Sequence, residues 1–111
     1  MSDYNPDKWM VVKITGNDLP PVYKVFACWS GGYLDGDSWK LNSGITKVTE
    51  KTDYIFFDGS SGSVYACRKG MYGSTAYGYG VLQNFIKKAA DNGVTIEVLP
   101  ETTNWLEINY E

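Results

Sequence analysis

Apolar and polar residues alternate with a period of two over the first two thirds of the chain. Lys8–Gly16 and Val22–Ser30 are apolar runs separated by the turn residues NDLPP, and Val22–Ser30 is apolar on both faces, which is typical of a central strand. Thr46–Asp53 alternates charged with β-branched residues, as an exposed strand does. Asp53–Gly59 and Ser63–Gly70 are joined through GSSG, which favours a tight hairpin. The pattern predicts an antiparallel meander.

The period changes to that of a helix between Tyr79 and Asn92. Its apolar positions share one face of a helix, and polar residues occupy the opposite face. The apolar positions are Val81, Leu82, Phe85, Ile86, Ala89 and Ala90. Asn92 and Gly93 form a good helix end, and Val94–Pro100 and Asn104–Tyr110 alternate again as two further strands. These elements predict an α+β fold in which one amphipathic α-helix packs on a mainly antiparallel β-sheet of about six strands.

Composition and charge narrow the function classes. The chain has the length of one domain, and we expect residues 1–111 to form a single unit. A net charge of −3, with scattered acidic residues, disfavours bulk nucleic-acid binding, which usually relies on clustered Lys and Arg. The sequence has no apolar run long enough to span a membrane, and its first residues, MSDYNPDK, do not resemble a secretion signal. We therefore expect a cytoplasmic protein without membrane contact.

Two cysteines, Cys28 and Cys67, fall in apolar, strand-like segments. Cytosolic thiols are normally reduced and buried cysteine is common, which favours a structural role for both residues. A disulfide between them would require neighbouring strands and stays an alternative. Two widely separated thiols in a chain without histidine make a poor zinc site.

The chain contains no histidine, which removes the commonest general base and the usual partner of a nucleophilic Ser or Cys. Catalysis would have to rest on carboxylates, and Asp35 and Asp37 in LDGDSW are the natural pair. They do not match a calcium-binding loop, because Trp39 stands where the next ligand is needed. Asp-Gly is also common in turns. Three roles therefore stay open for this pair, from most to least favoured: turn formation, polar contact with a ligand, and metal binding. We expect no catalytic constellation, no metal site and no cofactor.

The segment Trp29–Ile45 is rich in glycine and aromatic residues, and we interpret it as a loop. Trp29 continues the apolar face of the preceding strand and is expected in the core. Tyr33 and Trp39 are expected to face outward, where their rings and the two aspartates offer contacts to a ligand or a partner. The alternative is that the tryptophans fold inward and close the end of the core.

A second candidate site is the glycine-rich segment Arg68–Gly80, which precedes the helix. Glycine-rich loops at helix starts bind anions through backbone N–H groups and the helix dipole, and Arg68 and Lys69 would add positive charge. Neither the P-loop nor the dinucleotide-binding spacing is met, so nucleotide binding stays an alternative. Ser74 or Thr75 is suited to cap an early helical turn. Tyrosine is enriched where proteins bind proteins. The candidate contact tyrosines here are Tyr72, Tyr77 and Tyr79.

Two stretches of the sequence resemble a group of small accessory proteins encoded by tailed bacteriophages. They are VYKVFACWSGGYLDGDSWKLNSGITKV and FFDGSSGSVYACRKGMYG, which together span about residues 22–73. The resemblance implies a viral protein that acts in the cytoplasm of a bacterial host. It further implies binding to a host protein, or binding and sequestration of a signalling nucleotide of a defence system. It carries over no catalytic residue.

We therefore expect a small non-catalytic binding protein that acts by contact with a host protein, for example as an inhibitor of a defence or regulatory factor. The alternative is a binder of small, nucleotide-like ligands whose pocket is shared between the subunits of a homo-oligomer. A carboxylate-based enzyme is the least favoured class. A glycosidase of this size would lack the usual cleft, and a nuclease would need more acidic residues close together.

Overall fold

The structure, a computed structural model, describes residues 3–16, 18–32 and 36–110. Within these ranges the chain forms seven strands and one α-helix. In chain order the elements are β1 Lys8–Gly16, β2 Leu19–Gly32, β3 Gly36–Leu41, β4 Ile45–Glu50, β5 Tyr54–Gly59, β6 Val64–Arg68, α1 Ala76–Asp91 and β7 Val94–Val98. The α+β fold expected from the sequence is confirmed. Among the described residues no helix has the length and apolar character needed to cross a membrane.

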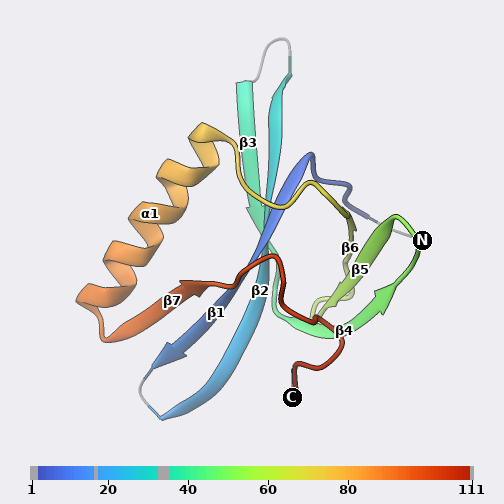
Figure 1. The fold of residues 1–111 in the computed structure, drawn as a ribbon. Helices are drawn as coiled ribbons and strands as arrows, with labels where there is room; N and C mark the ends of the chain where they lie inside the picture. The colour runs from blue at the N-terminus through green and yellow to red at the C-terminus, as the bar shows by residue number, and fades with distance from the viewer. Residues whose placement is uncertain (1–2, 17, 33–35, 111) are drawn as a thin grey trace.

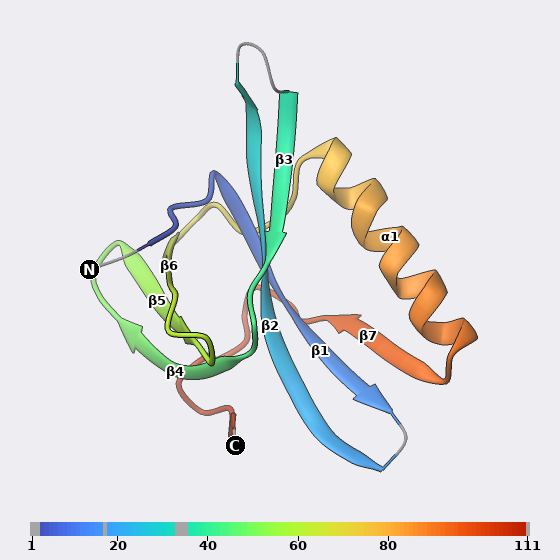
Figure 2. The same cartoon turned by 180° about the vertical axis from the view of Figure 1, so that it is seen from behind.

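The strands form two antiparallel sheets rather than the single sheet expected. The larger sheet has the order β3-β2-β1-β7, and the smaller sheet has the order β4-β5-β6. Figure 1 shows α1 on one side of the larger sheet and the smaller sheet on the other, and Figure 2 shows the same three layers from behind. The chain passes from one sheet to the other between β3 and β4, where Gly44 has a φ of +136°, a conformation that favours glycine.

Alternating burial in β1 explains why the larger sheet is covered on both faces. Trp9 and Val11 belong to the core on the side of the smaller sheet, whereas Met10 and Val12 belong to the core beneath α1. All four side chains are buried. Because successive side chains of a strand point to opposite faces, a continuous apolar run needs a layer on each side. The strand β2 follows the same rule, and its expected central position is confirmed.

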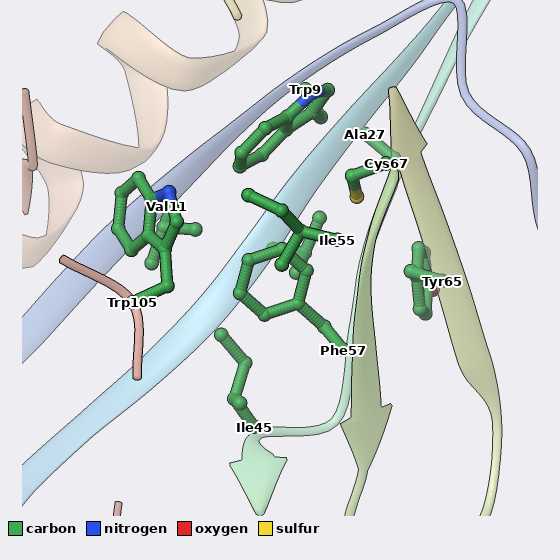
Figure 3. Packing of buried hydrophobic residues seen from close by; sticks show 10 residues of the cluster. Trp9, Val11, Ala27, Ile45, Ile55, Phe57, Tyr65, Cys67 and Trp105 are labelled. Carbon is green, nitrogen blue, oxygen red and sulfur yellow. The ribbon is translucent and has the colours of Figure 1, made fainter. Parts of the chain in front are cut away.

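Aromatic rings fill the layer between the two sheets (Figure 3). The ring centroid of Trp9 lies 5.5 Å from that of Phe57 and 5.8 Å from that of Trp105. Trp105 belongs to the segment that follows β7, and only 6% of its surface is exposed. This segment therefore closes one side of the layer between the sheets.

The helix begins at Ala76 rather than at Tyr79. The Thr75 hydroxyl oxygen accepts a hydrogen bond from the Gly78 N–H group at 3.0 Å, so the expected cap at this position is confirmed. Two glycines in the first turns concealed this start in the sequence, because glycine disfavours a helix. The expected end of the helix, with Asn92 at the C-cap, is confirmed.

Two expectations about strands are wrong. Trp29–Ile45 is not one loop, because it contains the end of β2 and all of β3, and within it Trp29 pairs with Ser38. Asn104–Tyr110 is not a strand. It is held in turns instead, one of them closed by a 3.1 Å hydrogen bond from the Glu107 N–H group to the carbonyl oxygen of Asn104. The buried ring of Trp105 fixes this segment in place of strand pairing.

Cys28 and Cys67 are both buried free thiols. Cys28 packs in the core beneath α1, and Cys67 packs in the core between the sheets. The larger sheet lies between these two cores, so the alternative of a disulfide is wrong. Burial raises the pKa of both thiols above the ordinary value, which fits a structural role.

Candidate functional site

The first turn of α1 presents two tyrosine side chains to solvent. Tyr77 is 52% exposed and Tyr79 is 57% exposed, and both rank among the most exposed large apolar side chains of the described residues. Their position follows from helix geometry. Gly78 and Leu82 face the core, and each residue advances the helix by about 100°, so the residues on either side of Gly78 project from the two flanks of the helix.

The glycine between the tyrosines has a packing role. A Cβ atom at Gly78 would overlap the sulfur of Cys28 and would lie 3.5 Å from the ring of Phe26. Gly78 therefore lets the start of α1 sit directly on β2, and a larger residue fits only if the helix or the Cys28 side chain moves.

The next glycine of the helix has no such role. Gly80 is exposed, and a Cβ atom added there would meet no atom within 4 Å. It lies about 200° around the helix from Gly78, on the side that faces away from the core. We call the exposed surface formed by Tyr77, Tyr79 and Gly80 the tyrosine surface.

Trp39 does not face outward as expected. Its ring is half-buried, stacks on Phe26 at 5.9 Å between ring centroids and meets the ring of Phe85 edge-on at 5.1 Å. It therefore joins the β2–β3 hairpin to α1. The alternative that a tryptophan of this segment folds inward is confirmed for Trp39.

The other candidates of the same segment are placed as follows. Trp29 packs against the core between the sheets, and its indole N–H donates to the carbonyl oxygen of Asn5 at 3.0 Å, in agreement with the expectation that it packs. Asp37 is half-buried and has an interaction partner. Tyr33 and Asp35 lie outside the described residues.

Tyr72 is a packing residue rather than part of an exposed surface. Its ring meets Trp9 edge-on at 4.8 Å and stacks on Trp105 at 5.9 Å. The hydroxyl group donates to the carbonyl oxygen of Leu99 and accepts from the N–H group of Val11 at 3.1 Å. Burial raises the pKa of Tyr72 to about 12. Tyr72 therefore links β1 to the segment after β7 and lies apart from the tyrosine surface.

Arg68 and Lys69 do not converge on one anion. Lys69 forms an ion pair with Glu50, with 2.6 Å between Nζ and Oε2. Arg68 is exposed and borders a different hollow, together with Tyr54 and Met71. Neighbouring residues at the end of a strand point in opposite directions. The structure therefore does not assemble the phosphate site that these two residues suggested.

An open hollow of about 410 Å³ lies at the end of the smaller sheet, beside the segment after β7. We call it the Trp105 hollow. Its lining consists of Trp9, Glu50, Ile55, Lys69, Gly70, Glu101, Thr102, Thr103, Asn104 and Trp105. Of these residues, Lys69 and Gly70 belong to the candidate segment Arg68–Gly80. The sequence did not single out the others as site residues, because the hollow joins segments that lie far apart in the chain. The polar run ETTN before Trp105 was the one local signal.

In the described part of the chain, His, Cys, Asp and Glu do not form a group of three that could hold a metal ion. Comparison of the chain with protein-family models, with curated protein sequences and with solved structures gives no significant match. The functional argument therefore rests on the surfaces described above.

Proposed function

We propose that this chain is a small, non-catalytic binding protein that acts by contact with another protein, and that the tyrosine surface is its contact site. Two tyrosines that are each more than half exposed support this proposal. Tyrosine rings provide a large, rigid contact area with a hydroxyl group for hydrogen bonding, and they are enriched in the centres of protein interfaces.

The main observation behind this proposal is the exposed glycine at position 80 of the helix. Glycine in a helix interior is less stable than alanine by about 0.5–1 kcal/mol, and the space around Gly80 would accept a side chain. The fold alone gives no reason for a glycine at this position. A partner that lies across the helix between Tyr77 and Tyr79 would supply one, because the missing side chain lets it approach the helix backbone closely.

The absence of charged side chains on the tyrosine surface indicates which chemical groups a partner would present to it. The first turn of α1 carries no acidic residue, and the side chains of the tyrosine surface are neutral. We therefore expect a partner that presents apolar groups and hydrogen-bonding groups rather than a charged patch. The sequence resemblance to accessory proteins of bacteriophages supports a bacterial host protein as this partner.

The test is capture of proteins from a bacterial lysate on the immobilised chain. The double variant Tyr77→Ala, Tyr79→Ala should lose the partner that the wild type retains, because it removes most of the contact area without touching the core. Leu106→Ala is the matched control, since Leu106 is 55% exposed and lies outside the tyrosine surface. A partner retained equally by all three proteins would show that the tyrosine surface is not the contact site.

A further inference from the structure

The Trp105 hollow has an apolar floor. Trp9, Ile55 and Trp105 are nearly buried, with exposed fractions of 2%, 6% and 6%. Figure 3 shows the three side chains close together, with the ring of Trp105 near the indole of Trp9. Because so little of the Trp9 and Trp105 indole rings is exposed, the floor offers their apolar edges to a ligand rather than a full stacking face. Binding in this hollow must therefore depend on the groups of its rim.

The rim of the hollow carries fixed hydrogen-bonding groups. On one side the ion pair holds the carboxylate of Glu50 and the ammonium group of Lys69 2.6 Å apart. On the other side the Thr103 hydroxyl donates to the carbonyl oxygen of Pro100 at 2.6 Å, which leaves its oxygen as an acceptor. The Asn104 side chain accepts from the Leu106 N–H group at 3.1 Å, a bond that uses its oxygen and not its two N–H donors. The rim therefore offers both hydrogen-bond donors and acceptors, several of them held in place by contacts within the chain.

The charges of the rim decide which ligands fit. Glu50 and Glu101 carry two negative charges and Lys69 carries one positive charge that is already paired. An anion such as a phosphate would be repelled by the carboxylates, so nucleotides are poor candidates for this hollow. Carboxylates accept strong hydrogen bonds from neutral hydroxyl groups. The hollow also has the volume of a small-ligand site, for which about 300–1,000 Å³ is usual.

We propose that the Trp105 hollow binds a neutral, polyhydroxylated ring, such as one sugar unit. The hydroxyl groups of the ring donate to Glu50 and Glu101 and accept from Lys69, while its C–H groups lie against the indole edges of Trp9 and Trp105. This site is separate from the tyrosine surface, with which it shares no residue. The proposal therefore does not depend on the proposed function.

The test is an NMR titration of the isotope-labelled chain with a panel of neutral sugars, consisting of glucose, galactose, mannose, N-acetylglucosamine and their common disaccharides. We expect at least one sugar to cause saturable shifts of the Gly70 and Thr102–Trp105 amide signals and of the Trp105 indole signal. Inorganic phosphate should leave these signals in place. Glu101→Gln should weaken the sugar binding about tenfold, the loss expected for one hydrogen bond to a charged group.

Two variants control this experiment. Glu107→Gln makes the same charge change at an exposed residue outside the hollow and should bind the sugar like the wild type. The double variant Tyr77→Ala, Tyr79→Ala should also bind it normally, so failure of the sugar site and failure of the tyrosine surface are distinguishable. No saturable shift with any sugar of the panel would overturn the proposal. So would shifts confined to other residues, or equal weakening by Glu101→Gln and Glu107→Gln.

Discussion

The two glycines of the first helical turns have opposite physical reasons. Gly78 is favoured by the fold, because a Cβ atom there would overlap the sulfur of Cys28 and crowd the hydroxyl of Thr75. Gly80 faces open space. In sequence the two positions look alike, since both stand next to a tyrosine in AYGYG. Only the packing of α1 on the larger sheet separates a structural glycine from one that is free for function.

This difference predicts opposite effects of the same substitution. Gly80→Ala should raise the free energy of unfolding by about 0.5–1 kcal/mol, because alanine is the better helix former. Gly78→Ala should lower it by about 1–3 kcal/mol, as overpacked core positions do, because the new methyl group meets the sulfur of Cys28. Chemical denaturation of both variants measures these changes. Effects of equal sign would contradict the placement of α1.

Prediction of single residues from the sequence was correct where neighbours in the sequence determine the role of the residue. Thr75 caps the helix because its hydroxyl reaches a neighbouring N–H group. Tyr77 and Tyr79 are exposed, and their role as contact residues stays a prediction. Tyr72 could not be separated from them by sequence. Its burial depends on Trp9 and on the segment after β7, which are distant in the chain.

At the scale of elements, periodicity predicted most of the fold. The strands β1, β2, β4, β5, β6 and β7 and the helix α1 were all expected, because each follows the residue period of its own geometry. The strand β3 was missed, since glycine and aspartate interrupt its pattern. The segment Asn104–Tyr110 was wrongly expected as a strand. Alternation makes pairing favourable only where a sheet edge is in reach, and burial of Trp105 holds this segment elsewhere.

The contact between β3 and α1 gives an element-scale prediction. Trp39→Ala should lower the free energy of unfolding by about 3 kcal/mol, at the lower end of the range for truncated core tryptophans, because the ring is half-buried between Phe26 and Phe85. Ser38→Ala, an exposed neighbour on the same strand, should change it by less than about 0.5 kcal/mol. Guanidinium denaturation compares the two. A stable Trp39→Ala protein would mean that the hairpin does not pack on the helix.

At the scale of the whole molecule, the core between the two sheets buries phenol groups, including one near the end of the chain. Burial raises the pKa of Tyr65, Tyr72 and Tyr110 to about 12 in each case. Burial also raises the pKa of Cys67 and Cys28. The folded chain therefore keeps protons that the unfolded chain releases at lower pH.

The sign of the resulting pH dependence follows from proton linkage. Unfolded tyrosine ionises near pH 10, so between about pH 10 and the folded value of about 12 the unfolded state binds fewer protons and stability falls as pH rises. Below the unfolded pKa values this contribution to stability is fully present. Melting temperatures measured against pH should fall in this alkaline window. Tyr72→Phe should make the fall shallower, because it removes one of the buried phenol groups.

The central claim is that a partner lies across α1 at Gly80, and one comparison tests it most directly. Gly80→Arg places a long, charged side chain between the two tyrosines, in a space that the fold leaves open. Thr52→Arg makes the same addition at an exposed turn residue outside the tyrosine surface. We predict that Gly80→Arg does not lower the melting temperature and loses the protein captured from a bacterial lysate, whereas Thr52→Arg retains it. Equal retention of that protein by both arginine variants would contradict the account.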